Sequence, residues 1–342
     1  MKKLLLPSGV FLSLFLLTAN IFAQAKIQPE KVPAKVWKGH ENSVTSIAVS
    51  TSGKWVASSS LDGTVKVWNA ESGSVINTIR SHTGDVYSVS ISKDERRIAS
   101  AGLDGRVVIS DLANGETLKV FSDFNGWCQA VVFSPDGERI AVSTTDGNVS
   151  VWEIESGKRL QTFESRSGQM SLAWSPDGKY LASGFINISI WDTTTGKVFK
   201  TLKGHDYYVY SLAFSPDGKL LASASLDTTI GIWDAGSGEI IRKIEPAGFS
   251  RTWKDKTIVD SIKVPVTAAA FSPDGKHLAT GGADKLVRLW NVADGKSLAG
   301  IQGHEMSITD LKFLPDGKHL ISSSLDRTIR LWNLKNEKES NP

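Results

Sequence analysis

The chain has 342 residues, of which 40% are hydrophobic and 22% charged, and 39 basic residues against 36 acidic ones give a formal net charge of +3. This near balance is no footprint for nucleic-acid binding, so no nucleic-acid partner is expected. Cys128 is the only cysteine, so an internal disulfide is excluded and stability has to come from the core. Length alone suggests two domains, but an internal repeat indicates one.

Residues 1–25 have the pattern of a signal peptide. Two lysines precede a mostly apolar stretch over residues 4–23, and an Ala-Gln-Ala cleavage site ends at Ala25. We expect export with cleavage after Ala25, which leaves a periplasmic or extracellular protein without stable membrane insertion. An uncleaved membrane anchor is the alternative, because about twenty apolar residues just span a bilayer.

Residues 26–34 predict a linker and residues 35–40 a β-strand, after which a unit of about 40 residues recurs seven times. The mark of the unit is a tryptophan that ends a β-rich run, and Ser110 takes the place of the tryptophan in the second unit. The six tryptophans are Trp68, Trp152, Trp191, Trp233, Trp290 and Trp332. A period of this length is typical of a propeller rather than a solenoid.

Each unit predicts four short strands separated by turns. In the fifth unit the runs YVYSLAFS, LLASAS, TTIGIW and EIIRKI are rich in β-branched and apolar residues, and SPDG separates the first two. Pro216 presets a turn conformation and Gly218 supplies a permissive backbone. Because one such unit cannot bury its own faces, seven of them are expected to pack as blades around an axis.

The chain resembles the WD-repeat (WD40) family from about residue 35 to residue 334. The carrying motifs are Gly-His at Gly39, Gly204 and Gly303, and Trp-Asp at Trp191 and Trp233. With the SPDG turns and the signal segment, they indicate an exported member of bacterial type. The resemblance implies an all-β, seven-bladed β-propeller with four-stranded antiparallel blades, formed as a single domain by residues 35–342.

The ends of the chain predict how the ring closes. Only ten residues follow Trp332, which is too few for another outer strand. The strand over residues 35–40 should therefore complete the seventh blade and remove an open sheet edge. Deleting residues 33–38 should open the ring.

Histidine, serine and aspartate recur together, with 22 residues from each histidine to its aspartate. One such set is a candidate hydrolytic triad, but the set occurs four times and no copy has an oxyanion-hole signature. The resemblance implies a structural, hydrogen-bonded tetrad with the repeat tryptophan, so we expect no catalytic residue among them. The complete sets are His40, Ser58, Asp62 and Trp68; His205, Ser223, Asp227 and Trp233; and His304, Ser322, Asp326 and Trp332.

The other four units lack part of this set. The second keeps His82, Ser100 and Asp104 but has Ser110, so Ser110→Trp is expected to raise the melting temperature. The third unit has Phe124 and Val142 in the histidine and hydroxyl positions, the fourth has no turn aspartate, and the sixth has Ile262 in the histidine position. Blades 3, 4 and 6 are therefore expected to be less rigid.

A metal or cofactor site is not expected. Four of the six histidines belong to the sets above, and His277 and His319 lie in equivalent turns of neighbouring units, too far apart to chelate. The chain has no phosphate-binding loop and no dinucleotide fingerprint.

The resemblance implies that the loops on one face of the ring bind partners. Leucine precedes the turn aspartate in four units, and aromatic residues gather in units 2, 3 and 5. A shared apolar rim is the prediction, and packing of each side chain on its own blade is the alternative. The candidate residues are Leu61, Tyr87, Leu103, Trp127, Tyr208, Tyr210, Leu226 and Leu325.

About 15 extra residues separate the fifth and sixth units within residues 246–263. Phe249, Arg251 and Trp253 give this segment the character of a recognition loop on the same face. A self-packed lid is the alternative.

These observations favour a non-catalytic, monomeric scaffold of the cell envelope or exterior that binds a protein or peptide on one face of the propeller. One alternative is a propeller hydrolase or lyase with its site at the channel mouth, and another is a self-assembling envelope scaffold. Fold alone does not choose among them.

Overall fold

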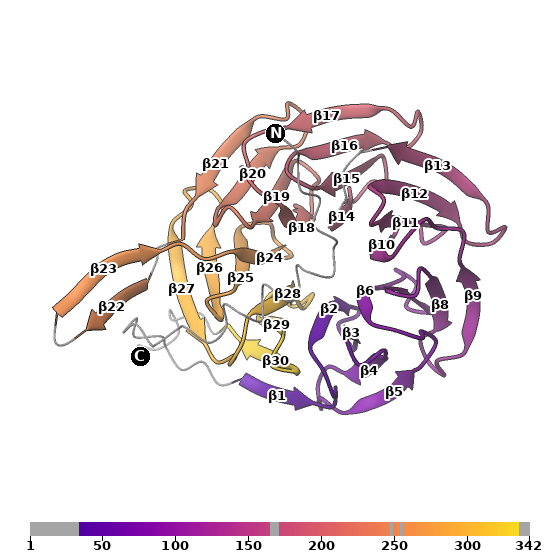
Figure 1. The fold of residues 1–342 in the computed structure, drawn as a ribbon, viewed down its shortest axis with the longest axis horizontal. Coiled ribbons are helices and arrows are strands. Elements are labelled where there is room, and N and C mark those ends of the chain that lie inside the picture. The colour runs from indigo at the N-terminus through magenta and orange to yellow at the C-terminus, as the bar shows by residue number, and fades with distance from the viewer. Residues whose placement is uncertain (1–33, 165–170, 247–248, 254–255, 335–342) are drawn as a thin grey trace, which may run out of the picture.

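The structure, a computed structural model, describes residues 34–164, 171–246, 249–253 and 256–334. These residues form strands and turns without a helix, and the strands make seven four-stranded antiparallel sheets and one two-stranded hairpin. Figure 1 shows the seven sheets as blades around a central axis. The predicted seven-bladed propeller is confirmed.

The strands of each blade run from the axis outward in chain order, except in blade 7. Blade 1 contains β2 (Val44–Val49), β3 (Trp55–Ser60), β4 (Val65–Asn69) and β5 (Val75–Ile79). Blade 2 contains β6 (Val86–Ile91), β7 (Arg97–Gly102), β8 (Val107–Asp111) and β9 (Thr117–Phe121). Blade 3 contains β10 (Cys128–Phe133), β11 (Arg139–Thr144), β12 (Asn148–Glu153) and β13 (Arg159–Glu164). Blade 4 contains β14 (Ser171–Trp174), β15 (Tyr180–Gly184), β16 (Ile188–Asp192) and β17 (Val198–Leu202).

The remaining strands follow the same plan with one insertion. Blade 5 contains β18 (Val209–Phe214), β19 (Leu220–Ser225), β20 (Ile230–Asp234) and β21 (Ile240–Ile244). The hairpin of β22 (Phe249–Trp253) and β23 (Lys256–Ile262) comes next. Blade 6 contains β24 (Val266–Phe271), β25 (His277–Gly282), β26 (Leu286–Asn291) and β27 (Ser297–Gln302). Blade 7 contains β28 (Ile308–Phe313), β29 (His319–Ser324), β30 (Thr328–Asn333) and, as its outermost strand, β1 (Ala34–Lys38).

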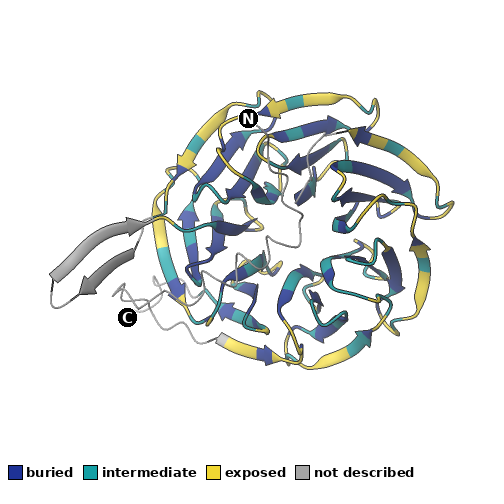
Figure 2. Ribbon diagram, viewed as in Figure 1, coloured by how far each residue is buried: buried dark blue, intermediate teal, exposed yellow. Residues whose placement is uncertain are grey.

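The core lies between neighbouring blades. In every blade except blade 6 the second strand is the most buried, and in β19 five of the six residues are buried. Its small alanine and serine side chains let the next blade approach, so Ala182 and Ile188 of blade 4 pack with Val209 and Trp233 of blade 5. Figure 2 shows the outermost strands as the exposed ones. Each blade therefore buries its faces only through its neighbours.

The SPDG turns join the first two strands and also link successive blades. Ser215 Oγ donates to Asp217 Oδ1 over 2.6 Å and accepts from the backbone N–H of Leu220 over 2.9 Å. Gly218 has a φ of +74°, and a Cβ on it would lie 3.4 Å from Pro176 of the preceding blade. A glycine here satisfies both the turn and the contact between blades.

The N-terminal strand closes the ring, as predicted. In blade 7, β1 pairs with β30 in antiparallel register from Ala34 opposite Trp332 to Lys38 opposite Thr328. Trp37 is 3% exposed and its ring stacks on Trp68 of blade 1 with 5.8 Å between centroids. The strand covers residues 34–38 rather than 35–40, because the chain turns away at Gly39 and uses His40 for a contact in blade 1.

The insertion between blades 5 and 6 is not a loop but a hairpin. Thr252 lies opposite Thr257 and Trp253 opposite Lys256 in the register of β22 and β23. The threonine, isoleucine and aromatic content of the segment favours strands over a loop. In Figure 1 the hairpin projects outward past the rim of the ring and does not lie over the channel, so it is no lid on that channel.

Candidate functional site

Three blades contain a complete chain of four hydrogen-bonded side chains, which we call the tetrad. In blade 5 the indole Nε1 of Trp233 donates to Ser223 Oγ over 2.8 Å. Ser223 Oγ lies 2.7 Å from His205 Nε2, and His205 Nδ1 lies 2.8 Å from Asp227 Oδ2. The same contacts join His40, Ser58, Asp62 and Trp68 in blade 1 and His304, Ser322, Asp326 and Trp332 in blade 7.

The direction of the hydrogen bonds along the tetrad shows that each tetrad histidine is neutral. Because the tryptophan donates to the serine, the serine hydroxyl is left to donate to Nε2, and Nδ1–H then donates to the carboxylate. Burial holds the pKa of His304 below its usual value in spite of its hydrogen bond to Asp326. Burial opposes ionisation of Asp326, but its hydrogen bond and charge interaction with His304 outweigh that effect and hold the pKa of the carboxyl well below its usual range.

The tetrads are built for stiffness rather than reaction. Ser223 and Ser322 are 0% exposed, so neither hydroxyl reaches a substrate. Both ring nitrogens of each histidine are already engaged, which leaves no nitrogen to act as a base. These groups satisfy one another inside the blade, as buried polar groups must.

Each complete tetrad is extended by a threonine, which the sequence did not lead us to expect. Thr64, Thr229 and Thr328 each donate a hydroxyl to the second carboxylate oxygen of the tetrad aspartate, over 2.6 to 2.7 Å. The available signal was a threonine two residues after each of these aspartates. In blade 2 that position is Arg106.

Blade 2 has an incomplete tetrad. His82 Nδ1 lies 3.0 Å from Asp104 and its Nε2 lies 2.9 Å from Ser100 Oγ. Ser110, in the tryptophan position, is 1% exposed and its hydroxyl has no hydrogen-bond partner among the described residues. An unpaired buried hydroxyl of this kind destabilises the fold.

Blades 3, 4 and 6 satisfy their tryptophans in other ways. The indole donors of Trp152, Trp191 and Trp290 bind Ser150, Ser183 and Thr280 over 2.8 to 2.9 Å. In blade 6, Arg288 pairs with Asp284, and this pair takes the place of the histidine–aspartate contact. The lower rigidity of these blades stays a prediction.

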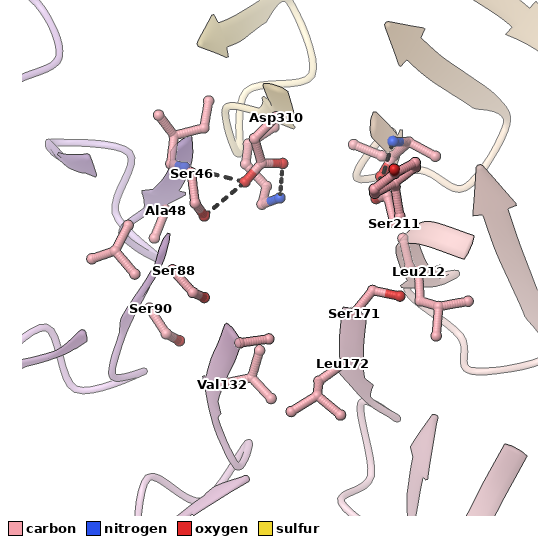
Figure 3. Close-up of a pocket in the computed structure, with 18 of the residues that line it drawn as sticks. Ser46, Ala48, Ser88, Ser90, Val132, Ser171, Leu172, Ser211, Leu212 and Asp310 are labelled. Atoms are coloured by element: carbon pink, nitrogen blue, oxygen red, sulfur yellow. Dashed lines mark hydrogen bonds and ion pairs between the residues drawn. The ribbon is translucent and has the colours of Figure 1, made fainter. Parts of the chain in front are cut away.

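The innermost strands surround a channel whose cavity measures about 490 Å³. Figure 3 shows Ser46, Ser88, Ser90, Ser171 and Ser211 around it, interspersed with apolar side chains, so hydroxyl and apolar groups share the lining. Asp310 and Lys312 are the charged members of the lining in the described part of the chain, and Lys312 Nζ donates to Asp310 over 2.6 Å. Asp310 also accepts from Ser46 Oγ and from the N–H of Ile47, so it connects blade 7 to blade 1.

The four turn leucines are less exposed than the sequence suggests. Leu61, Leu103 and Leu226 are half-buried and Leu325 is 7% exposed. In blade 2 the loop before β6 lies close to this leucine, since a Cβ on Gly84 would lie 3.4 Å from Leu103. Binding of a partner by these leucines stays a prediction, and Leu325 offers little surface for it.

The four aromatic candidates lie on this loop face and are all half-buried. Tyr87 and Tyr210 line the mouth of the channel, and burial raises the pKa of Tyr210 to about 12. Trp127 and Tyr208 each hold a backbone contact to the adjacent turn, through Thr145 and Leu226. Partner binding by these residues stays a prediction.

An exposed apolar ledge lies where blades 4 and 5 meet. We define the blade 4–5 ledge as Phe185, Ile186, Tyr207 and Tyr208. Tyr207 is 59% exposed and Ile186 37% exposed, while Phe185 and Tyr208 pack with 4.7 Å between ring centroids. The sequence reasoning missed Phe185 and Ile186 because blade 4 lacks the turn aspartate that marks this position in other units.

The candidates in the insertion do not join this ledge. Phe249, Arg251 and Trp253 all belong to β22, in the hairpin that projects from the rim. The sequence predicted this segment on the loop face, whereas its backbone lies in a hairpin at the rim. Its side chains lie outside the described part of the structure.

The described residues contain no group of three or more metal-binding side chains. His319 Nδ1 lies 2.6 Å from Asp316 in its own turn, and His277 lies beside Asp274 in the equivalent turn. None of the described residues forms a helix with the length and hydropathy needed to cross a bilayer. The signal peptide and its cleavage after Ala25 fall outside the described residues.

The chain was compared with known protein families and curated proteins. The family model described as "WD domain, G-beta repeat" matches residues 31–69, 73–111, 115–153, 157–194, 196–234, 256–291 and 295–333.

Several curated proteins are similar to part of the chain. The periodic tryptophan protein 2 homolog of Schizosaccharomyces pombe is 30% identical over 139 residues, which are 39% of this chain and 14% of that protein. The nuclear distribution protein nudF of Aspergillus niger is 32% identical over 125 residues, which are 36% of this chain and 25% of that protein. The pre-mRNA-splicing factor cwf17 of Schizosaccharomyces pombe is 27% identical over 141 residues, which are 40% of this chain and 37% of that protein. The matched segments thus span well under half the length of these relatives.

Proposed function

Because the chain belongs to the WD-repeat family, we propose that it is a non-catalytic scaffold that binds a protein or peptide on the loop face of its propeller. The proposal is supported by a rigid closed ring that carries loops of varied sequence at one face. It also draws on two of the relatives, whose names describe a nuclear-distribution and a splicing role rather than a chemical reaction.

The blade 4–5 ledge is the observation that carries the proposal. Tyr207 and Ile186 expose apolar surface on loops that are fixed by the blades beneath them. Aromatic side chains on a rigid support are typical of residues that dominate binding energy at interfaces. The ledge is therefore the place where we expect a partner to anchor.

The channel favours binding over catalysis. A hydrolase or lyase within the channel would need a free acid and base, whereas Asp310, the one carboxylate of the described lining, is engaged by Lys312, Ser46 and Ile47. The tyrosines at the mouth keep their protons, since burial raises the pKa values of Tyr87 and Tyr210 to about 12. Groups of this kind do not exchange protons near neutral pH.

We further propose that the chain is exported, as a member of bacterial type that is cleaved after Ala25. The support is the sequence of residues 1–25 alone. Mass spectrometry of the mature N-terminus tests this point: a chain that starts at Lys26 is expected, and an intact Met1 in the membrane fraction would mean an anchor instead.

Affinity capture with matched variants tests the binding proposal. The ledge variant carries Ile186→Ala and Tyr207→Ala, and the control carries Leu118→Ala and Leu298→Ala, which are 53% and 52% exposed on the outer strands β9 and β27. We expect wild type and control to retain a polypeptide that the ledge variant loses, with all three melting alike. If the control also lost the polypeptide, or if all three proteins retained it, the ledge would not be the binding surface.

A further inference from the structure

Asp85 carries a carboxylate that the fold leaves without a partner. It lies on the loop face of blade 2, directly before β6, and its side chain is half-buried. It forms no hydrogen bond or ion pair with any residue in the described ranges, although its backbone oxygen accepts from the N–H of Leu103 over 2.8 Å. Burial alone raises the pKa of Asp85 above its usual value, with no donor nearby to lower it. Such a group costs stability.

The equivalent position in blade 1 shows what the fold would accept there. Ser43 Oγ donates to the carbonyl of Leu325 in the preceding blade over 3.2 Å. For Asp85 the corresponding carbonyl is that of Leu61, and an ionised carboxylate has no proton to donate to it. The turn aspartates Asp62 and Asp104, by contrast, are paired with histidines. Asp85 therefore replaces a useful hydrogen bond with an uncompensated negative charge.

Two aromatic residues share the sector with Asp85. Tyr87 follows two residues later, in the bulged part of β6, and it lines the channel. Burial and then the charge of Asp85 raise the pKa of Tyr87 to about 12, so the two groups are near enough to interact. Trp127 stands at the position equivalent to Asp85 on blade 3, and the loops of the two blades touch, since a Cβ on Gly105 would lie 3.1 Å from the carbonyl oxygen of Gly126.

No cation of the described chain neutralises this sector. Arg106 is the nearest basic residue along the loops of blade 2, and it is exposed and forms no ion pair among the described residues. Glu41 on blade 1 adds a second exposed negative charge to the same face. A carboxylate attracts cations through its charge, and aromatic rings attract them through their negative faces.

We propose that Asp85, with Tyr87 and Trp127, is a recognition point for a lysine or arginine side chain of the bound protein or peptide. The inference rests on the proposed binding function and adds to it the charge of the partner. A cationic group that docks here gives Asp85 the partner that the fold withholds. Discrimination follows, because a neutral side chain at this point would leave the carboxylate desolvated and unpaired.

Panning a bead library of random seven-residue peptides tests the inference. The proteins are wild type, Asp85→Asn, and the control Asp206→Asn, which removes an exposed carboxylate from the same face of blade 5. Wild type and control are expected to enrich lysine and arginine several-fold, and Asp85→Asn to lose that enrichment while it keeps apolar preferences. A resynthesised peptide should bind Asp85→Asn roughly tenfold more weakly.

The outcomes separate this inference from the proposed function. Peptides retained by wild type without enrichment of lysine or arginine, or the same enrichment with Asp85→Asn, would overturn the inference and leave the binding function standing. Failure of wild type to retain any peptide above bare beads would count against both.

A melting experiment tests the premise without a ligand. Asp85→Ser introduces the residue that blade 1 uses at this position, so the melting temperature should rise while the preference for cationic peptides disappears. A lower melting temperature would mean that Asp85 is already satisfied in the fold, and the inference would then be wrong.

Discussion

At the scale of single residues, the tetrads illustrate how one buried hydroxyl organises a blade. Ser223 accepts from Trp233 and contacts His205, so a single small side chain satisfies two larger ones. Removing one member leaves a buried donor or acceptor unpaired, which costs more than the bond itself contributes. The tetrads therefore set the tolerance of each blade to substitution.

The structure reverses the expectation for Ser110→Trp. In the complete tetrads a glycine lies against the tip of the tryptophan, and a Cβ on Gly303 would come within 2.6 Å of Trp332. Blade 2 has Ser81 at that position. Ser110→Trp alone should lower stability by roughly 1–3 kcal/mol through overpacking, whereas the pair Ser81→Gly and Ser110→Trp should melt above the single variant. The melting temperatures of both variants test this prediction. If Ser110→Trp alone melted above wild type, the packing argument would be refuted.

The tetrad aspartates also predict a dependence of stability on pH. Burial opposes ionisation of Asp62 and Asp227, but hydrogen bonds from their histidines and threonines hold both pKa values below the ordinary 3.8. A carboxyl whose pKa is lower in the folded state stabilises the fold above that ordinary value, and the stabilisation is lost as the pH falls below it. Denaturant unfolding at several pH values between 7 and 3 should therefore show a steep loss on the acid side.

Asp326→Asn is the matched variant, because it removes one such carboxyl. It should be less stable than wild type at pH 7 and lose less of its stability on acidification. Identical slopes for the two proteins would show that the tetrad carboxyls do not govern acid unfolding.

At the scale of elements, closure of the ring depends on one short strand. β1 supplies only five residues to blade 7, but Trp37 within it is buried against Trp68 of blade 1. Apolar burial across this junction adds to the backbone pairing with β30. The closing strand thus joins the first and last blades through both its backbone and one side chain.

Trp37→Ala should destabilise the fold by about 3–5 kcal/mol, because it deletes a buried aromatic side chain. Val36→Ala, at a neighbouring residue that is 41% exposed, is the control and should change stability by less than about 0.5 kcal/mol. Trp37→Phe should be tolerated better than Trp37→Ala, since the indole nitrogen has no hydrogen-bond partner among the described residues. Equal unfolding midpoints for the alanine variants would contradict the role of Trp37.

The hairpin is expected to be dispensable for folding. β22 and β23 pair with each other and with no other described strand. Deleting residues 249–262 leaves a connection between blades 5 and 6 about as long as the six residues between Leu202 and Val209. The deletion variant should melt close to wild type, and a large drop would show that the hairpin packs on the ring.

At the scale of the whole molecule, periodicity carried most of the prediction. The seven blades, their strand order and the closing strand follow from the spacing of tryptophans and SPDG turns. Contacts made in three dimensions do not follow from it. No local pattern reveals that Leu325 is buried, and Arg288 replaces a histidine whose position in the sequence is displaced by the insertion. Phe185 and Ile186 were not predicted for a related reason: the shortened turn of blade 4 lacks the aspartate by which the equivalent residues of other units are aligned.

The central claim is that a foreign polypeptide binds the loop face of a closed, non-catalytic ring. Site-specific photo-crosslinking tests it most directly, with the photoreactive residue p-benzoylphenylalanine placed at position 207 on the ledge or at position 118 on the outer strand of blade 2. We predict an adduct with another polypeptide from position 207 and none from position 118. Adducts from position 118 alone, or adducts from position 207 only with a second copy of this chain, would contradict the claim.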